Sequence, residues 1–140
     1  MSDELYERLI AITRSDRRFH PRSYEFIFEA LEYTIRHRDT GGHVSGHELL
    51  DGIREFALQE FGFLSRAVFE MWGIHCTEDF GHIVFNLVDH NLMRKTDQDS
   101  LEDFRDGFDF LEAFDAEFQP DLSTVTLDPP TLSPQGPLYD

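Results

Sequence analysis

The chain has 140 residues, of which 40% are hydrophobic and 14% aromatic, enough for the core of one globular domain. Its formal net charge of −16 is uneven, because residues 1–38 hold seven basic and seven acidic side chains whereas residues 39–140 hold five basic and twenty-one acidic ones. Such a field repels nucleic-acid phosphates and anionic lipid, and it favours solubility or a basic partner.

Cysteine usage and the N-terminal residues bear on the cellular compartment. A single cysteine cannot form a disulfide within the chain, and this fits a reducing compartment. The first residues lack the basic and apolar regions of a signal peptide, and no apolar run approaches the roughly 20 residues that span a bilayer. We therefore expect a cytoplasmic protein.

The first half of the chain has helical patterns. Apolar spacing predicts a helix over residues 3–14 and a second one that begins at Pro21 and ends near residue 38. Ser45 and Glu48 form a capping-box pattern that predicts the start of a third helix, which continues to about Gly62.

The stretch 63–114 is typical of a winged helix-turn-helix. A helix over about 64–72 leads through a turn into a helix over 78–91, which Thr77 is predicted to cap. Residues 92–95 then resemble a strand, and the alternation of Phe108 and Phe110 with acidic residues suggests the returning strand of a β-hairpin wing. A helix over 99–114 fits nearly as well.

The predicted fold class is therefore mainly α, with about five helices and a winged-helix-like C-terminal half. An all-α bundle is the alternative. We assign residues 1–118 to one globular domain. Residues 119–140 are acidic, rich in proline and free of basic residues, which predicts a disordered tail.

A helix-turn-helix raises the question of DNA binding. A DNA-reading helix needs Arg, Lys, Asn or Gln on its exposed face and cations on its flanks, but no Lys or Arg lies between Arg66 and Arg94. Glu78 and Asp79 stand at the end of the helix that would meet the groove. Charge thus disfavours nucleic acid, although a transcription regulator stays open as an alternative function.

The second alternative is a small metal-binding protein, with His75, Cys76 and His82 as candidate zinc ligands. Structural zinc sites usually contain paired cysteines, and this chain has one. The simpler interpretation makes Cys76 a small apolar residue in a turn and the histidines surface groups. We expect no cofactor.

No pattern in the sequence predicts an enzyme. A phosphate-binding glycine-rich loop and a nucleophile elbow are both missing from the sequence. His75 and Cys76 form a possible base and nucleophile, but adjacent residues seldom point at each other. Thiolate activation at a helix N-terminus is the remaining physical route for Cys76.

Several blocks of residues together resemble an uncharacterised bacterial family of small conserved hypothetical proteins, of the planctomycete and verrucomicrobial type. The blocks are Phe19–Tyr24, His43–Gly46 with Glu48–Leu50, Trp72–Gly73, Thr77–Gly81 with Ile83–Asn86, and Lys95–Thr96 with Asp99–Ser100 and Asp103–Phe104. They cover roughly Phe19 to Phe114. The resemblance implies a bacterial source and a cytoplasmic single-domain protein, and it transfers no catalytic residue because the family has no assigned activity.

These observations favour a non-enzymatic protein–protein interaction module on a winged-helix-like scaffold, with an unknown protein as its partner. The many phenylalanines exceed what one small core is expected to hide, so part of them should mark a contact surface. The predicted partner-binding residues are His82, Asn86, Arg94, Lys95, Phe108 and Phe110.

Overall fold

The computed structural model describes residues 3–39 and 41–116. Within these ranges the chain forms five α-helices, which are α1 (Asp3–Ser15), α2 (Pro21–Arg36), α3 (Gly46–Phe61), α4 (Ser65–Met71) and α5 (Thr77–Asp89). Three shorter elements accompany them, the 3-10 turns η1 (Gly62–Leu64) and η2 (Leu101–Phe104) and the π-helical turn η3 (Leu111–Ala116).

The mainly α prediction is confirmed, and so are the five helices. The β-hairpin wing is wrong, because residues 92–95 and 108–110 form no strand and the described residues contain none at all. The reason lies in the periodicity of the buried residues. Phe110, Ala113 and Phe114 are the residues of this stretch that turn inward, at helical spacings of three and one rather than at the spacing of two that a strand requires.

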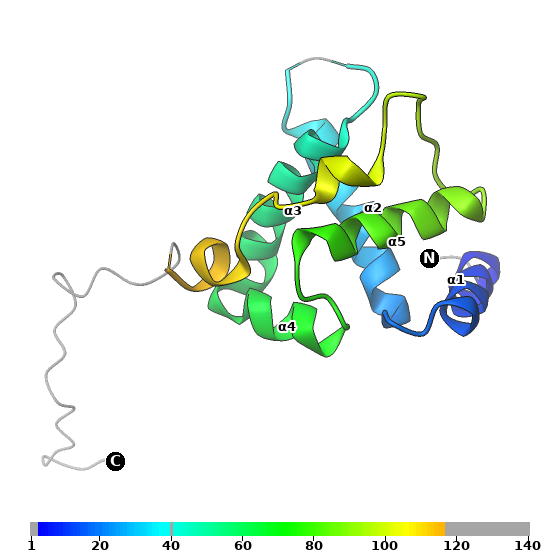
Figure 1. The fold of residues 1–140 in the computed structure, drawn as a ribbon, viewed down its shortest axis with the longest axis horizontal. Coiled ribbons are helices and arrows are strands. Elements are labelled where there is room, and N and C mark those ends of the chain that lie inside the picture. The colour runs from blue at the N-terminus through cyan, green and yellow to red at the C-terminus, as the bar shows by residue number, and fades with distance from the viewer. Residues whose placement is uncertain (1–2, 40, 117–140) are drawn as a thin grey trace, which may run out of the picture.

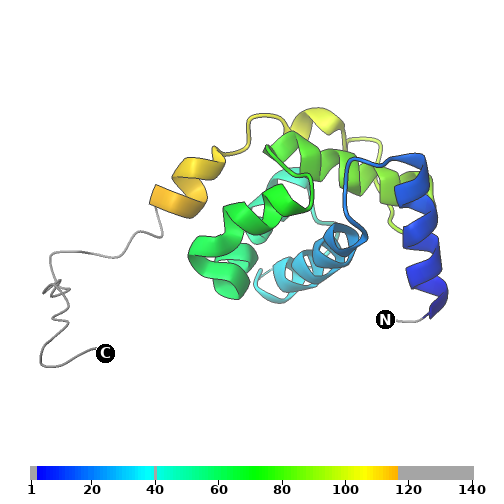
Figure 2. The ribbon, with the colours of Figure 1, turned by 90° about the horizontal axis from the view of Figure 1, so that it is seen from below.

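The helices α2 and α3 pack along each other and form the centre of the fold, and α5 crosses α2 (Figure 1). Helix α1 packs against α2 at one side of the molecule. On the opposite side η3 packs against α4 and η1, as Figure 2 also shows from below. The first and the last described elements therefore stand at opposite ends of the domain.

The core is aromatic, and Phe69 on α4 lies at its centre. Its fully buried ring contacts six other aromatic rings at centroid distances of 5.1 to 6.4 Å, those of Phe26, Phe61, Trp72, Phe80, Phe110 and Phe114. These rings come from α2, α3, α5, η3 and the residues beside α4 and η3. Edge and tilted ring contacts of this kind stabilise the fold beyond the contribution of the buried apolar area. One aromatic cluster thus joins α2, α3, α4, α5 and η3.

This core corrects the expectation of a phenylalanine contact surface. Phe26, Phe110 and Phe114 are buried, and Phe63 is the one phenylalanine that is strongly exposed among the described residues. Phe118, like the predicted tail at 119–140 and the end of the predicted domain, lies outside the described residues.

The helix ends confirm one predicted cap and correct another. Ser45 Oγ accepts a hydrogen bond from the Glu48 N–H at 3.1 Å while the Glu48 carboxylate accepts one from the Ser45 N–H at 2.9 Å, so the capping box is present. Thr77 does not cap α5. The N-cap residue is Cys76, and the Thr77 hydroxyl serves a different purpose, described below.

In the part of the chain that the structure describes, no helix combines the length and the apolar character needed to cross a membrane.

Helices α2 and α3 approach each other closely at Gly52. A Cβ added there would lie 1.7 Å from Thr34 Oγ1 on α2. Thr34 is buried, and its hydroxyl donates a hydrogen bond to the Ala30 carbonyl at 2.7 Å, which fixes the position of that oxygen. A side chain larger than glycine at position 52 would therefore force the two helices apart.

We predict that Gly52→Ala lowers the free energy of unfolding by about 3 kcal/mol, because overpacking a tight contact costs that much. Urea denaturation followed by circular dichroism measures the change. Gly41→Ala is the matched control, since an added Cβ meets nothing within 4 Å there. Equal stability of the two variants would contradict the close packing of α2 and α3.

Candidate functional site

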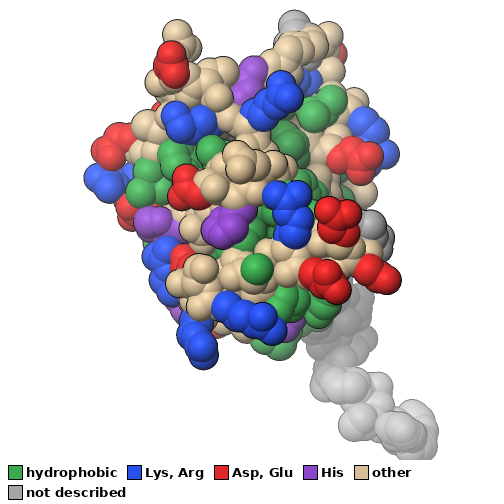
Figure 3. Space-filling model, turned by 90° about the vertical axis from the view of Figure 1, so that its right-hand side faces the viewer, with side chains coloured by type: hydrophobic (Ala, Val, Ile, Leu, Met, Phe, Trp, Pro, Cys, Tyr) green, Lys and Arg blue, Asp and Glu red, His purple; other side chains and the backbone are tan. Residues whose placement is uncertain are grey.

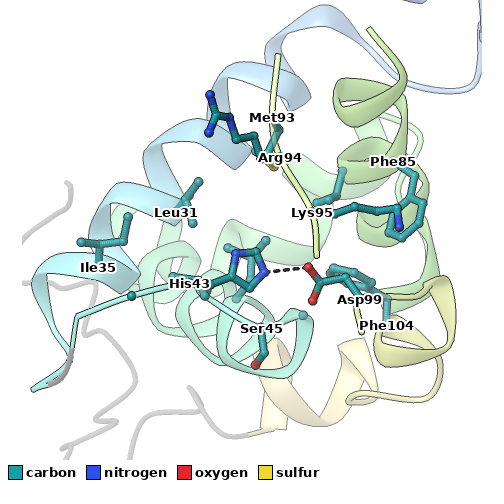
Figure 4. A pocket seen from close by; sticks show the side chains of 15 residues that line it. Leu31, Ile35, His43, Ser45, Phe85, Met93, Arg94, Lys95, Asp99 and Phe104 are labelled. Atoms are coloured by element: carbon teal, nitrogen blue, oxygen red, sulfur yellow. Dashed lines mark hydrogen bonds and ion pairs between the residues drawn. The ribbon is translucent and has the colours of Figure 1, made fainter. Parts of the chain in front are cut away.

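A cavity of about 260 Å³ opens between two loops that follow α2 and α5. We call it the loop cavity. Residues 42–45 form one side, residues 93–95 with Asp99 form another, and Phe104 with residues of α2, α3 and α5 supplies the rest (Figure 4). Its lining is mostly apolar, with Leu31, Ile35, Val44, Leu49, Val84, Phe85, Met93 and Phe104.

Phe104 forms one wall of the loop cavity, and two glycines allow it to lie there. A Cβ on Gly46 would meet the Phe104 ring at 3.1 Å, and a Cβ on Gly81 would meet Phe104 Cβ at 2.8 Å. The Thr77 hydroxyl donates a hydrogen bond to the Phe104 carbonyl at 2.6 Å and accepts one from the Gly107 N–H at 2.9 Å. Segment 104–107 is thereby fixed directly on α3 and α5.

The rim of the loop cavity contains a histidine–aspartate pair. His43 Nε2 lies 2.6 Å from Asp99 Oδ2, which joins the two loops across 56 residues of sequence. The Asp99 carboxylate also accepts a hydrogen bond from the Thr96 N–H at 2.8 Å. Burial by itself raises the pKa of Asp99, but the hydrogen bonds from Thr96 and His43 outweigh it and hold that pKa below its ordinary value. Asp99 is therefore ionised at neutral pH.

Arg94 and Lys95 stand at the same rim. Both are exposed, and among the described residues neither has a carboxylate partner; the Lys95 ammonium only approaches the Thr96 carbonyl, at 3.4 Å. Arg38 differs, since it forms an ion pair with Glu48 at 3.1 Å. The face in Figure 3 carries basic, acidic and hydrophobic side chains beside one another.

The structure separates the six predicted partner-binding residues. Arg94 and Lys95 line the loop cavity, whereas Phe108 and Phe110 line a different one. Phe110 is only 7% exposed and contacts the Phe69 ring, so it is a core residue. Phe108 is half-buried and stacks on Phe110 at 5.9 Å. The surface predicted from this phenylalanine pair is therefore wrong for Phe110.

The Asn86 side chain is hydrogen-bonded to other residues of the protein. Its amide donates hydrogen bonds to Asp16 Oδ2 at 2.9 Å and to the Tyr24 hydroxyl at 3.0 Å. The Arg18 guanidinium, bonded to the same carboxylate, holds the pKa of Asp16 well below its usual range. This network joins the α1–α2 link to α5, so Asn86 has a structural role. His82 is half-buried on the same helix and lines neither of these two cavities.

The candidate metal ligands do not come together. His75 and Cys76 line the second cavity, of about 380 Å³, with Glu78, Arg105 and Asp109 among its other residues, and His82 is not part of it. In the described ranges no group of three His, Cys, Asp or Glu side chains could hold a metal ion.

The Cys76 thiol shows no sign of activation. Partial burial raises its pKa, and the nearby Asp79 carboxylate acts in the same direction, against the opposing effect of the neighbouring backbone N–H groups of Glu78 and Asp79. The environment of Cys76 thus does not favour the thiolate at this helix N-terminus.

Comparison of the chain with protein-family models, with curated proteins and with solved structures finds no match.

Sequence reasoning missed the pairing of His43 with Asp99. The two residues are far apart in the sequence, and no local motif connects them. One signal was present, because both belong to the blocks on which the family resemblance is based. Those blocks meet in space at the rim of the loop cavity.

We predict that Phe110→Ala lowers the free energy of unfolding by about 3 kcal/mol, because it removes a buried ring and leaves a void in the core. Leu111→Ala is the control: its side chain is 59% exposed, so the loss should stay under about 1 kcal/mol. Chemical denaturation of both variants gives the comparison. Equal stability of Phe110→Ala and the parent chain would contradict the position of Phe110 in the core.

Proposed function

We propose that the protein is a non-enzymatic interaction module and that the loop cavity is its binding site. The partner is a protein segment that inserts one large apolar side chain into the cavity and places carboxylates beside it. The observation that carries this proposal is the position of Arg94 and Lys95, two cations without carboxylate partners in the described residues, at the rim of an apolar cavity.

The size of the loop cavity favours a single side chain. Pockets that enclose a drug-sized ligand usually hold about 300–1,000 Å³. The loop cavity, at about 260 Å³, is smaller than that range and partly open. A buried aromatic or aliphatic anchor in such a pocket is the usual centre of a protein–protein interface, with a polar rim around it.

The charge of the rim determines the chemistry of the partner. The chain as a whole is strongly acidic, but exposed charges farther away than about 8 Å are largely screened at physiological salt. At contact distance the partner meets Arg94 and Lys95, whereas the Asp99 carboxylate at the same rim is already bonded to His43 and to the Thr96 N–H. Carboxylates beside the apolar anchor complement these two cations, and complementary charges mainly set specificity and the rate of association.

The alternative functions gain no support from the described residues. A DNA-reading role for α5 would need free polar groups on the helix, and Asn86 is bonded to Asp16 and Tyr24. The metal alternative lacks a ligand cluster among the described residues. The bacterial family resemblance and the cytoplasmic location stay predictions.

Selection from a random peptide library displayed on phage, with the full chain as bait, tests the proposal. We expect the enriched peptides to share one Phe, Leu or Trp with Asp or Glu next to it. The double charge reversal R94E/K95E should weaken their binding by about ten-fold, because exposed charge contacts are each worth up to about 1 kcal/mol.

R14E/R17E is the matched control. It makes the same change in charge at two exposed arginines outside the loop cavity, and it should leave the affinity unchanged. Two results would overturn the proposal: a selection that enriches no peptide, or enriched peptides that bind R94E/K95E as tightly as the parent chain.

A further inference from the structure

Helix α4 and the turn before it have two apolar faces, and the core covers one of them. Phe69 and Trp72 point inward and are buried. The other side consists of four exposed residues at spacings of three and four, which are Phe63, Leu64, Ala67 and Met71. We call these four residues the α4 face. Glu70 is the one other exposed residue of the stretch 62–71.

The α4 face is unusually exposed for apolar side chains. A helix that is apolar on all sides is normally buried. Here the exposed fraction of the side chain is 70% for Phe63, 53% for Leu64 and 73% for Met71. Neighbouring exposed apolar residues of this kind mark interaction sites in soluble proteins. The α4 face is therefore suited to burial by a partner.

The segments that carry and adjoin the α4 face are acidic. Residues 60–71 and the segment 109–115, whose turn η3 packs against α4, contain five acidic residues and one basic residue, which are Glu60, Glu70, Asp109, Glu112 and Asp115 against Arg66. The basic residue is already paired, because the Arg66 guanidinium lies 2.6 Å from the Asp115 carboxylate and 3.1 Å from that of Glu70. A partner at this surface thus meets an excess of negative charge.

We propose that the α4 face binds a basic amphipathic helix of another protein. The apolar stripe of that helix covers the α4 face, and its Lys or Arg side chains lie beside Glu70 and Glu112. The α4 face spans eight residue steps, roughly 12 Å at the α-helical rise. A helix bound through side chains at i, i+3, i+4 and i+7 covers the same length.

Charge favours this partner over the other occupants of an apolar surface. A second copy of the chain would bring the same acidic residues to the interface. Residues 117–140 of the chain contain four acidic residues and no basic one, so they are not complementary either. Anionic lipid and nucleic acid are repelled by the same carboxylates. The inference goes beyond the proposed function, because no residue of the α4 face lines the loop cavity.

A synthetic peptide of about 14 residues tests the inference. It has leucine at i, i+3, i+4 and i+7 and lysine elsewhere, and the same peptide with glutamate in place of lysine is the charge control. Fluorescence anisotropy of the labelled peptides with the full chain gives the affinities, and amide chemical shifts of the ¹⁵N-labelled chain locate the site. We expect the lysine peptide to shift residues 62–71 and 111–115 and to bind about ten-fold more tightly than the glutamate peptide.

Two pairs of variants separate the apolar contribution from the charge. L64Q/M71Q should weaken binding of the lysine peptide by about ten-fold, because two buried apolar contacts are lost. Tyr6→Gln is its control, since it changes an exposed aromatic residue on α1. E70Q/E112Q should weaken binding by about five-fold. E4Q/E7Q makes the same change in charge on α1, and both controls should alter the affinity less than about two-fold.

Three results would overturn the inference: equal binding of the lysine peptide to the parent chain and to L64Q/M71Q, equal binding of the two peptides, or amide shifts confined to residues 41–50 and 92–105. Sedimentation of the parent chain as a dimer that L64Q/M71Q abolishes would also overturn it, because a second copy would then cover the α4 face. The two proposals are tested with oppositely charged peptides, so one can fail without the other.

Discussion

Burial of three phenylalanines on the C-terminal segment determines both the fold and the candidate site. Phe104, Phe110 and Phe114 are nearly or fully buried, and each large apolar side chain removed from water contributes roughly 2–3 kcal/mol. Together they hold residues 100–116 against α3, α4 and α5, as short helical turns. Because Phe104 forms a wall of the loop cavity, the same burial places Asp99 within reach of His43. The loop cavity thus depends on the core.

The helices were predictable because their signals are local. Apolar spacing gave α1 and α2, and the capping box of Ser45 and Glu48 gave the start of α3. The absence of the predicted wing could not be foreseen from spacing alone, because the alternation of Phe108 and Phe110 with acidic residues is also typical of a strand. A tertiary contact determines the structure of this segment. Phe110 packs against Phe69, which lies on a helix more than forty residues away in the sequence. In short segments, packing against the core determines the secondary structure more than the local residue pattern does.

The site was only partly predictable. Arg94 and Lys95 are predicted as partner-binding residues, and both line the loop cavity. Helical periodicity places Asn86 on the exposed face, but its amide donates hydrogen bonds to Asp16 and Tyr24, and periodicity does not reveal such partners. His43 and its carboxylate partner lie in separate loops. Residues 101–104 pack on Gly46 and Gly81, which places the second loop beside the first, and no local pattern of residue types encodes that contact.

Hydrogen–deuterium exchange of the full chain, with and without a saturating peptide from the phage selection, tests the central claim most directly. The loop cavity predicts slower exchange in residues 41–50 and 92–105, where the peptide would cover both loops. The chain also exposes a second set of large apolar side chains, which are Phe63, Leu64, Met71 and Leu111. Slower exchange confined to residues 62–71 and 111–116 would show that the partner binds there, and would contradict the loop cavity as the binding site.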